Sequence, residues 1–337
     1  MFRSARYQGG FSIDAVASCD FERLVPVTNA EVLERGGRKA DPRLLGFLCQ
    51  EVGIEGRFFC PPERNAFDLA KEAIERLLAQ DPSLRTEAEF LIYCGISNPM
   101  PTVCHAALLA HELEFTSASC WDLKSGCSTA VLGLVQALEW FERGARRGVL
   151  VASETFSKFT NPEALELAAT SGDGACAIAL SATDAWRARG VVHGTNPTYF
   201  KSAYVPGKYP VDVERWRQSD YWFSFDAKPQ AITAIGEAWV KSLADVLQVS
   251  ELPGERVTHY VSHQIDAKKN RQFAKSGQVP DAAIYENFRR FGNMGCPTVL
   301  LNYQSRPLPT YAKGDVLLFH AVGGGISHAA LCLERMR

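Results

Sequence analysis

The chain has 337 residues, of which 46% are hydrophobic and 22% are charged, and its formal net charge is −2. This is the composition of an ordinary globular protein, and a near-neutral charge without a basic block argues against a nucleic-acid-binding surface. The 10 cysteines include no CxxC pair and the 7 histidines no HExxH run, so we expect no metal site.

The first half of the chain predicts alternating helices and strands. Apolar residues recur at intervals of three and four over 66–79, which predicts a helix. The continuous apolar run 90–94 is typical of a strand buried on both faces. The same patterns then predict two helices and two strands, over 103–112, 128–143, 149–152 and 175–180.

The second half repeats this plan. A helix over 232–247 precedes a strand over 257–261, and two more strands follow over 316–319 and 329–333. The order of helix, strand and polar turn therefore occurs twice, near 66–95 and near 232–263. We expect two similar α/β halves, residues 1–185 and 186–337, stacked so that reactive groups at strand ends face one cleft.

The region 195–230 breaks this pattern, because it is rich in aromatic residues and has little clean periodicity. We interpret it as an insertion that lines or covers a substrate channel. An ordinary aromatic loop packed on the core is the alternative interpretation, and the sequence does not decide between the two.

The start of the chain lacks a basic segment followed by an apolar one, and no apolar run reaches the roughly 18 residues that a membrane-spanning helix needs. We therefore expect a cytoplasmic protein with reduced thiols and without membrane or nucleic-acid partners.

Three reactive or polar groups lie where predicted elements begin or end. Cys127 comes directly before the helix 128–143, where unpaired N–H groups and the helix dipole favour the thiolate, the nucleophilic form. His263 follows the strand 257–261, and Asn293 lies in a glycine-containing turn. A Cys, a His and an Asn at three such junctions indicate acyl-transfer chemistry.

From about residue 45 to its end, the chain resembles the ketosynthase III branch of the thiolase superfamily, the condensing enzymes of the β-ketoacyl-ACP synthase III type. The segments that carry the resemblance occur in the family's order: Gly53-Ile54-Glu55-Gly56-Arg57, Asp122 five residues before Cys127, Gly172-Asp173-Gly174-Ala175, His263-Gln264, Gly292-Asn293 and Gly323-Gly324-Gly325. The resemblance implies a thiolase-like fold with two duplicated α/β halves in a five-layer α-β-α-β-α arrangement. It also implies a homodimer that uses acyl-CoA or an acyl carrier protein and needs no cofactor of its own.

The sequence departs from the family pattern near the predicted active site. Asp266 and Lys268 stand where the family usually has Asn and Arg, and the segment 293–296 reads Asn-Met-Gly-Cys instead of Asn-Thr-Ser-Ala. These changes leave the Cys–His–Asn set intact. They make the chain resemble an atypical member from secondary metabolism more than a housekeeping fatty-acid enzyme.

The resemblance implies a role for each catalytic candidate. Cys127 would hold the acyl group as a thioester, and its backbone N–H would form an oxyanion hole with that of Gly324. His263 and Asn293 would donate hydrogen bonds to the enolate that forms when a malonyl-type thioester loses CO₂. His263 could also help to ionise Cys127.

Four more residues are candidates for substrate contact. Met100 stands where the family has a dimer-loop residue that reaches the partner's acyl pocket, although plain interface packing would also explain a flexible thioether there. Arg57, Asp266 and Lys268 would contact the substrate or its phosphopantetheine-bearing carrier. Asp266 and Lys268 could instead form an ion pair on the surface.

Decarboxylative condensation is the first hypothesis for the reaction. An acyltransferase that passes the Cys-bound acyl group to an alcohol or amine is the second, and Asn293 argues against it because such relatives often replace that residue. Non-decarboxylative joining of two acyl chains ranks lower, because it needs an added base and residues 98–100 supply none. An inactive partner subunit is the fourth reading, which the intact Cys–His–Asn set opposes.

Overall fold

The computed structural model of the chain describes residues 1–5, 7–208, 210–218, 221–225, 228–306 and 311–337. The N-terminal sheet consists, in spatial order, of β2 (Gly10–Ser18), β8 (Asp173–Thr183), β7 (Arg147–Thr155), β5 (Phe90–Cys94) and β6 (Ser119–Leu123). The C-terminal sheet consists of β1 (Phe2–Ser4), β9 (Trp186–Thr195), β14 (Ser327–Arg335), β13 (Val316–Gly323) and β12 (His259–Ser262).

The strand pairings in the two sheets follow one plan. In the N-terminal sheet β2, β8 and β7 pair antiparallel, and β7 pairs parallel with β5. In the C-terminal sheet β9, β14 and β13 pair antiparallel, and β13 pairs parallel with β12. The duplication predicted from residues 66–95 and 232–263 therefore extends to the topology of the sheets.

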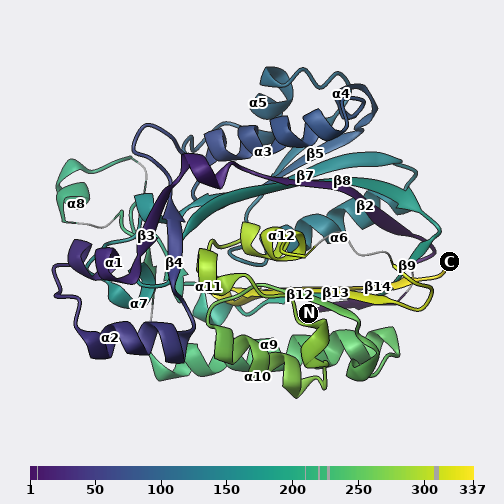
Figure 1. The fold of residues 1–337 in the computed structure, drawn as a ribbon. Helices are drawn as coiled ribbons and strands as arrows, with labels where there is room; N and C mark the ends of the chain where they lie inside the picture. Colours follow the sequence, from purple (N-terminus) through teal and green to yellow (C-terminus); the bar gives the residue numbers. More distant parts are fainter. Residues whose placement is uncertain (6, 209, 219–220, 226–227, 307–310) are drawn as a thin grey trace.

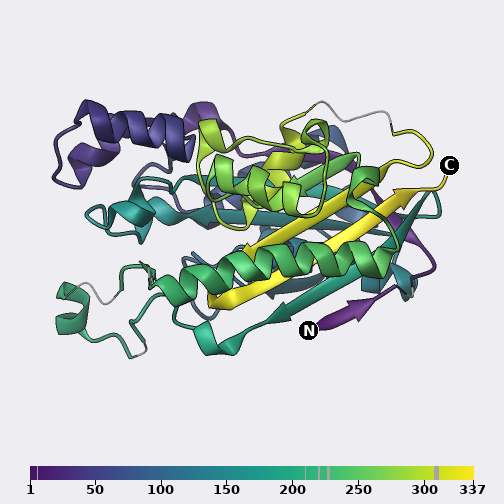
Figure 2. The same ribbon diagram turned by 90° about the horizontal axis from the view of Figure 1, so that it is seen from below.

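The sheets alternate with three layers of helices (Figure 1). One outer layer is α3 (Ala66–Gln80), α4 (Leu84–Glu87) and α5 (His105–Glu112). The layer between the sheets is α6 (Thr129–Glu142) and α12 (Pro297–Gln304), and the other outer layer is α9 (Pro229–Ser250) and α10 (Ala267–Ser276). Figure 2 shows α9 lying along the outer face of the C-terminal sheet. The predicted five-layer arrangement is confirmed.

Burial explains why the helices and strands of different layers have different hydrophobic patterns in the sequence. The five residues of β5 are all buried, which is why this strand is a continuous apolar run. α6 and α12 contact both sheets and are apolar around most of their circumference, whereas the outer helix α3 buries one face and starts with a capping box formed by Asn65 and Asp68.

The first 65 residues contain elements that the periodicity did not predict. β3 (Val25–Thr28) and β4 (Gly56–Phe59) form a hairpin-like pair at one end of the molecule, and α1 (Asn29–Arg35) and α2 (Pro42–Phe47) lie in the excursion between them (Figure 1). Two short helices, α7 (Leu165–Ala168) and α11 (Phe288–Phe291), lie at the same end.

The chain passes from one sheet to the other between Thr183 and Trp186, the ends of β8 and β9. β1 nevertheless pairs with β9, so the first residues of the chain belong to the C-terminal sheet. The described residues contain no helix that is both long and apolar enough to span a membrane.

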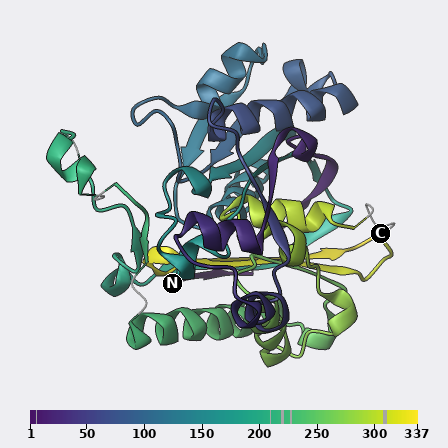
Figure 3. The same cartoon turned by 60° about the vertical axis from the view of Figure 1, so that its left-hand side comes forward.

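The aromatic-rich insertion is packed at its base and open at its tip. The Phe223 ring contacts Phe156 and Phe159 at centroid distances of 5.6 and 5.4 Å. The strands β10 (Ala203–Tyr204) and β11 (Ser224–Phe225) pair, and α8 (Val213–Arg217) projects from the body of the molecule, with Trp216 61% exposed (Figure 3). The core-packed interpretation therefore holds only for the base. Tyr209 lies outside the described residues.

Candidate active site

Cys127 lies in a tight turn between β6 and α6. Gly126 takes a left-handed φ of +58°, and Ser128 is the N-cap of α6. The Thr129 hydroxyl accepts a hydrogen bond from the Ser125 N–H at 2.8 Å, which closes the turn. The cysteine therefore lies directly before a helix, as predicted.

Two serines join this turn to the glycine loop after β13. The Ser327 hydroxyl donates to the Ser125 carbonyl at 2.7 Å, and the Ser128 hydroxyl donates to that of Ser327 at 2.8 Å. A Cβ at Gly323 would lie 2.5 Å from the Cys127 nitrogen, so the backbone can approach this closely only without a side chain. The backbone N–H groups of Cys127 and Gly324 both interact with the Cys127 sulfur.

The thiol of Cys127 is held as a thiol, not as a thiolate. Its pKa is raised to about 12, chiefly by burial and next by the negative charge of Glu154, while the N–H groups of Cys127 and Gly324 lower it. Part of the residue is accessible to solvent even so. The N–H groups at the start of the helix favour the thiolate, as expected, but desolvation outweighs them.

His263 follows β12, and its N–H bonds the His320 carbonyl of β13 at 2.9 Å. Its side chain is fully buried, and neither ring nitrogen has a hydrogen-bond partner among the described residues. Burial lowers the pKa of His263 to about 3, and the backbone of Gly295 opposes this effect. The imidazole is therefore neutral near pH 7, with one nitrogen able to donate and the other able to accept.

Gln264, the second residue of the His-Gln pair, positions the segment that leads to Asn293. Its side-chain oxygen accepts the N–H groups of Asn287 and Phe288 at 3.1 and 2.8 Å, and its amide donates to the Tyr285 carbonyl at 2.6 Å. A buried amide that binds three backbone groups ties the turn after β12 to α11. The Gln of the His-Gln motif therefore has a structural role.

Asn293 lies in a turn that packs against the Gly172-Asp173-Gly174 segment. Its N–H donates to the Thr170 carbonyl at 2.7 Å, and its carbonyl accepts the Gly172 N–H at 3.0 Å. Its Oδ1 accepts the Gly295 N–H at 2.9 Å, which orients the amide. The Nδ2 group forms no hydrogen bond with the described residues and can donate to a bound molecule.

Glu154 is a site residue that the sequence reasoning missed. It is fully buried at the end of β7, and its carboxylate accepts the N–H groups of Ile96 and Ser97, each at 2.9 Å, and the thiol of Cys296 at 3.2 Å. Its charge acts on the thiol of Cys127. The available signal was a carboxylate directly after the buried apolar strand, at the edge where the reactive groups were expected.

These contacts link the predicted catalytic residues in two groups. Gly324 and Cys127 meet at the sulfur, and the turn of Asn293 reaches His263 through Gly295. Cys296, three residues after Asn293, interacts electrostatically with Cys127. Among the described residues, no group of three or more His, Cys, Asp or Glu side chains is arranged to hold a metal ion.

The remaining predicted contacts are placed differently from expectation. The Arg57 guanidinium is inside the protein, where one terminal nitrogen donates to Asn29 Oδ1 at 2.8 Å and the other to the Ala169 carbonyl. Asp266 is the N-cap of α10 and accepts the Lys269 N–H at 2.9 Å. The burial of Arg57 argues against a direct substrate contact, whereas Asp266 is partly exposed and its substrate contact stays a prediction.

Lys268 and Met100 remain accessible. Lys268 pairs with Glu51 at 2.6 Å, not with Asp266, and both side chains of the pair are more than half exposed. Met100 is partly exposed in the loop between β5 and α5, the loop whose Ile96 and Ser97 bind Glu154. Asp122 supports this region, because its carboxylate accepts the N–H groups of the first two residues of α5.

Comparison with known proteins agrees with this geometry. The family model described as 3-oxoacyl-[acyl-carrier-protein (ACP)] synthase III matches residues 121–197, and the model of its C-terminal part matches residues 247–335. The beta-ketoacyl-[acyl-carrier-protein] synthase III of Caldanaerobacter subterraneus subsp. tengcongensis is 24% identical over 295 residues, which cover 86% of this chain and 88% of that protein. The 3-oxopimeloyl-[acyl-carrier-protein] synthase of Rhodothermus marinus is 27% identical over 303 residues and covers 86% and 85%.

A solved structure has the same fold. The crystal structure of 3-oxoacyl-(acyl-carrier protein) synthase from Burkholderia xenovorans LB400 matches with a TM-score of 0.84 at 22% identity, over 99% of this chain and 95% of that chain. The resemblance and the fold class inferred from the sequence are confirmed.

Proposed function

We propose a reaction for this chain, which belongs to the ketosynthase III branch of the thiolase superfamily. The enzyme transfers an acyl group from CoA or an acyl carrier protein to Cys127. It then condenses this group with a malonyl-type thioester by a decarboxylative Claisen reaction. The observation that supports the proposal is the close approach of the glycine loop to the Cys127 turn, where a Cβ at Gly323 would lie 2.5 Å from the Cys127 nitrogen and the N–H groups of Cys127 and Gly324 act on the sulfur.

The first half-reaction moves the acyl group to the sulfur. Cys127 sulfur attacks the thioester carbonyl, the bond to the donor sulfur breaks, and the proton of Cys127 ends on the departing thiol. The carbonyl oxygen becomes an oxyanion during the attack, and the N–H groups of Cys127 and Gly324 are the donors available to stabilise it.

The proton transfer needs a base, because burial keeps the thiol protonated at neutral pH. We assign this relay to His263, whose ring nitrogens lack a partner among the described residues; its lowered pKa makes it a weak base, so the proton rests on the imidazole only in passing. Its low pKa means that the imidazolium holds the proton weakly and releases it readily to the departing thiolate.

The second half-reaction forms the carbon–carbon bond. Loss of CO₂ from the malonyl-type thioester leaves an enolate, which attacks the acyl carbonyl on Cys127. A 3-oxoacyl thioester leaves, and the Cys127 thiolate takes up a proton. The His263 N–H and the Asn293 Nδ2 group are two neutral donors that can stabilise the enolate oxygen before the attack.

The free amide of Asn293 favours condensation over transfer to an alcohol or amine, because decarboxylation uses that second donor. Non-decarboxylative joining of two acyl chains would need a base that faces the substrate. Glu154 is a poor candidate for that base, since Ile96, Ser97 and Cys296 all donate hydrogen bonds to its oxygens.

The setting of the reaction is also part of the proposal. A homodimer would bring Met100 to a partner's acyl pocket. The strand β6 lies at the edge of its sheet, and its Trp121 is 50% exposed, so this edge is available for a dimer that pairs the two β6 strands. The basic residues of α10, which include Lys268, lie near the His263 turn and suit the phosphate of a CoA or phosphopantetheine substrate. The ten cysteines are free, which suits the reducing cytoplasm. Asp266 and Lys268, which replace the family's usual Asn and Arg, suit an enzyme of secondary metabolism such as polyketide synthesis.

The test separates the two half-reactions. The chain is incubated with radiolabelled acyl-CoA and acyl carrier protein substrates, and peptide mapping locates the label on Cys127. Cys127→Ser loses the label, whereas Cys120→Ser, a partly exposed cysteine in the preceding strand, retains it. Asn293→Ala still takes up the label but no longer releases CO₂ from malonyl thioester. Label on another residue, or undiminished CO₂ release by Asn293→Ala, refutes the assignment.

A further inference from the structure

We propose that the cavity between the β3–β4 pair and the helices α11 and α12 binds a small organic anion, a phosphate or carboxylate head on an apolar body. This binding site is separate from the reaction proposed above. Its lining includes residues 26–28, 55–58, 286–287 and 289–291, and none of Cys127, His263, Asn293 and Gly324.

The cavity has the size and the walls of a ligand site. Its volume of about 1040 Å³ is at the upper end of the range for small-molecule pockets. Phe21, Phe58 and Phe291 form one wall, with ring centroids 4.7 to 5.6 Å apart. An apolar body of a ligand can cover these rings, which otherwise face an open space.

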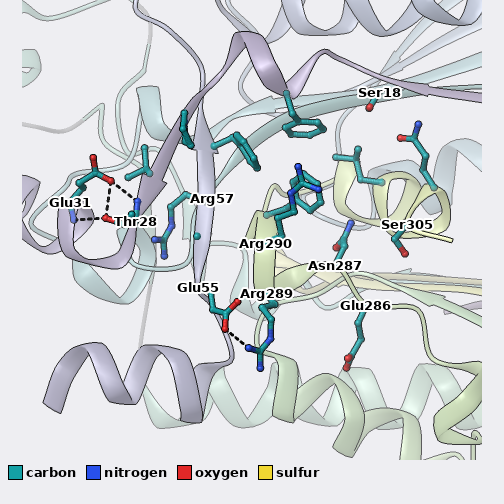
Figure 4. A pocket seen from close by; sticks show the side chains of 18 residues that line it. Ser18, Thr28, Glu31, Glu55, Arg57, Glu286, Asn287, Arg289, Arg290 and Ser305 are labelled. Carbon is teal, nitrogen blue, oxygen red and sulfur yellow. Dashed lines mark hydrogen bonds and ion pairs between the residues drawn. The ribbon is translucent and has the colours of Figure 1, made fainter. Parts of the chain in front are cut away.

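One cation of the lining lacks a carboxylate partner. Arg290 is exposed, and its guanidinium lies over the rings of Phe58 and Phe291 at 5.7 and 5.1 Å, with no ion pair among the described residues. Figure 4 shows the Arg290 side chain beside these rings in the middle of the cavity. A guanidinium held flat on aromatic rings keeps its N–H edge available for a carboxylate or phosphate.

Arg57 adds a second positive charge at the wall. It is 1% exposed, and its hydrogen bonds go to an amide and a carbonyl; no carboxylate lies within ion-pair distance in the described part of the chain. Its Nε–H has no partner but is covered by protein, so Arg57 acts on a ligand in the cavity through its charge alone. Burial lowers the pKa of Arg57 only to about 10, so the group is charged near pH 7.

The carboxylates of the lining are already neutralised or bound. Glu55 pairs with Arg289, and Glu286 pairs with Arg271 at 2.6 Å. Glu31 accepts the Thr28 N–H at 2.6 Å as part of a capping box. Among the described lining residues, Arg57, Arg290 and the exposed Glu31 have no ion-pair partner, which leaves an excess of one positive charge and favours an anion over a cation or a neutral sugar.

Asn287 is the second, independent sign of a ligand. It is 7% exposed and lines the cavity, and neither its Nδ2 nor its Oδ1 has a hydrogen-bond partner among the described residues. Figure 4 shows its amide directed into the same space as Arg290. A buried amide without a partner is unfavourable in the empty protein. Both of its polar atoms are covered by protein, so a bound oxyanion or its ester oxygen would satisfy the amide only after the side chain rotates toward the cavity.

The test is isothermal titration calorimetry of the full chain with octyl phosphate, octanoate and uncharged octanol, which share one apolar body. We expect saturable binding of at least one anion and at least tenfold weaker binding of octanol. Arg290→Gln should weaken anion binding about tenfold, the loss of one charge-assisted contact. Arg76→Gln, which removes a half-exposed arginine that pairs with Asp20 on the outer helix α3, is the control and should bind as the parent does.

Asn287→Leu separates a ligand contact from a structural role. Leucine has a similar volume and removes the unpartnered polar atoms, so the unliganded variant should melt at the same or a higher temperature than the parent. It should bind the anion about tenfold more weakly. Octyl phosphate and octanoate together report whether the head is a phosphate or a carboxylate. No saturable binding of either anion, equal binding of octanol, or parent-like binding by both variants overturns the proposal.

Discussion

Replacing Glu154 by glutamine tests the electrostatic control of Cys127. The carboxylate is the second-largest cause, after burial, of a rise in the pKa of Cys127 from 9.0 to about 12. Glutamine removes the charge and keeps the shape. The variant therefore lowers the pKa of Cys127, and each unit of decrease corresponds to about 1.4 kcal/mol.

The expected change in reactivity follows from this shift. Well below the pKa, each unit of decrease in it raises the thiolate fraction about tenfold, while the weaker basicity lowers the intrinsic nucleophilicity roughly threefold. Alkylation of Cys127 by iodoacetamide at pH 7 to 8 should therefore become roughly threefold faster for each unit of decrease. The variant should also lose stability, because a glutamine N–H₂ would face one of the N–H donors of Ile96 or Ser97, at about 1–3 kcal/mol.

The assay is the pH dependence of Cys127 alkylation, followed by mass spectrometry of the Cys127 peptide. Glu72→Gln is the matched control. Glu72 is a buried carboxylate on α3 that forms ion pairs with Arg23 and Arg64, and it does not act on Cys127. The control should leave the alkylation profile unchanged. An unchanged or slower alkylation in Glu154→Gln would refute the electrostatic role of this carboxylate.

Three further predictions follow from the site. Gly323→Ala places a Cβ 2.5 Å from the Cys127 nitrogen and should lower self-acylation at least tenfold, with a loss of about 1–3 kcal/mol in unfolding free energy; parent-like acylation would contradict the close approach. Burial raises the pKa of Asp173 to about 6 from 3.8, so its contribution to stability is present below pH 3.8 and lost as the pH rises to about 6, by roughly 3 kcal/mol. Urea unfolding from pH 3.5 to 6.5 should show this decline relative to Asp173→Asn, and parallel curves would contradict it. Since the pKa of His263 is about 3, CO₂ release from malonyl thioester should show no histidine inflection between pH 5 and 8, and an inflection near 6.5 that disappears in His263→Ala would contradict a buried neutral imidazole.

Much of the fold was readable from local patterns. The apolar run 90–94 forms β5 with the predicted bounds, and the helix predicted over 66–79 forms α3 over Ala66–Gln80. Such segments are buried on one or both faces, so their hydrophobic period survives in the sequence. The first 65 residues were harder, because their short helices and strands pack at one end of the molecule and carry no long period.

The functional residues also divide into those with a local signal in the sequence and those that depend on contacts between distant segments. The positions of Cys127 before a helix and of His263 after a strand are local facts, and the sequence predicted them. Glu154 and the cavity around Asn287 were not predicted, because each depends on segments distant in the sequence that meet only when the two halves are stacked. The N-cap role of Asp266 was not considered, although an Asp before a helix is a normal N-cap.

By itself, the sequence predicted the long helices and buried strands, their duplication, and three candidate side chains for acyl transfer, because these follow from period, spacing and residue type. Only the tertiary structure decided the protonation of those side chains and the partners of the charged residues. The reason is physical: desolvation and charge–charge interactions depend on distances between segments, and these distances exist only in the folded chain.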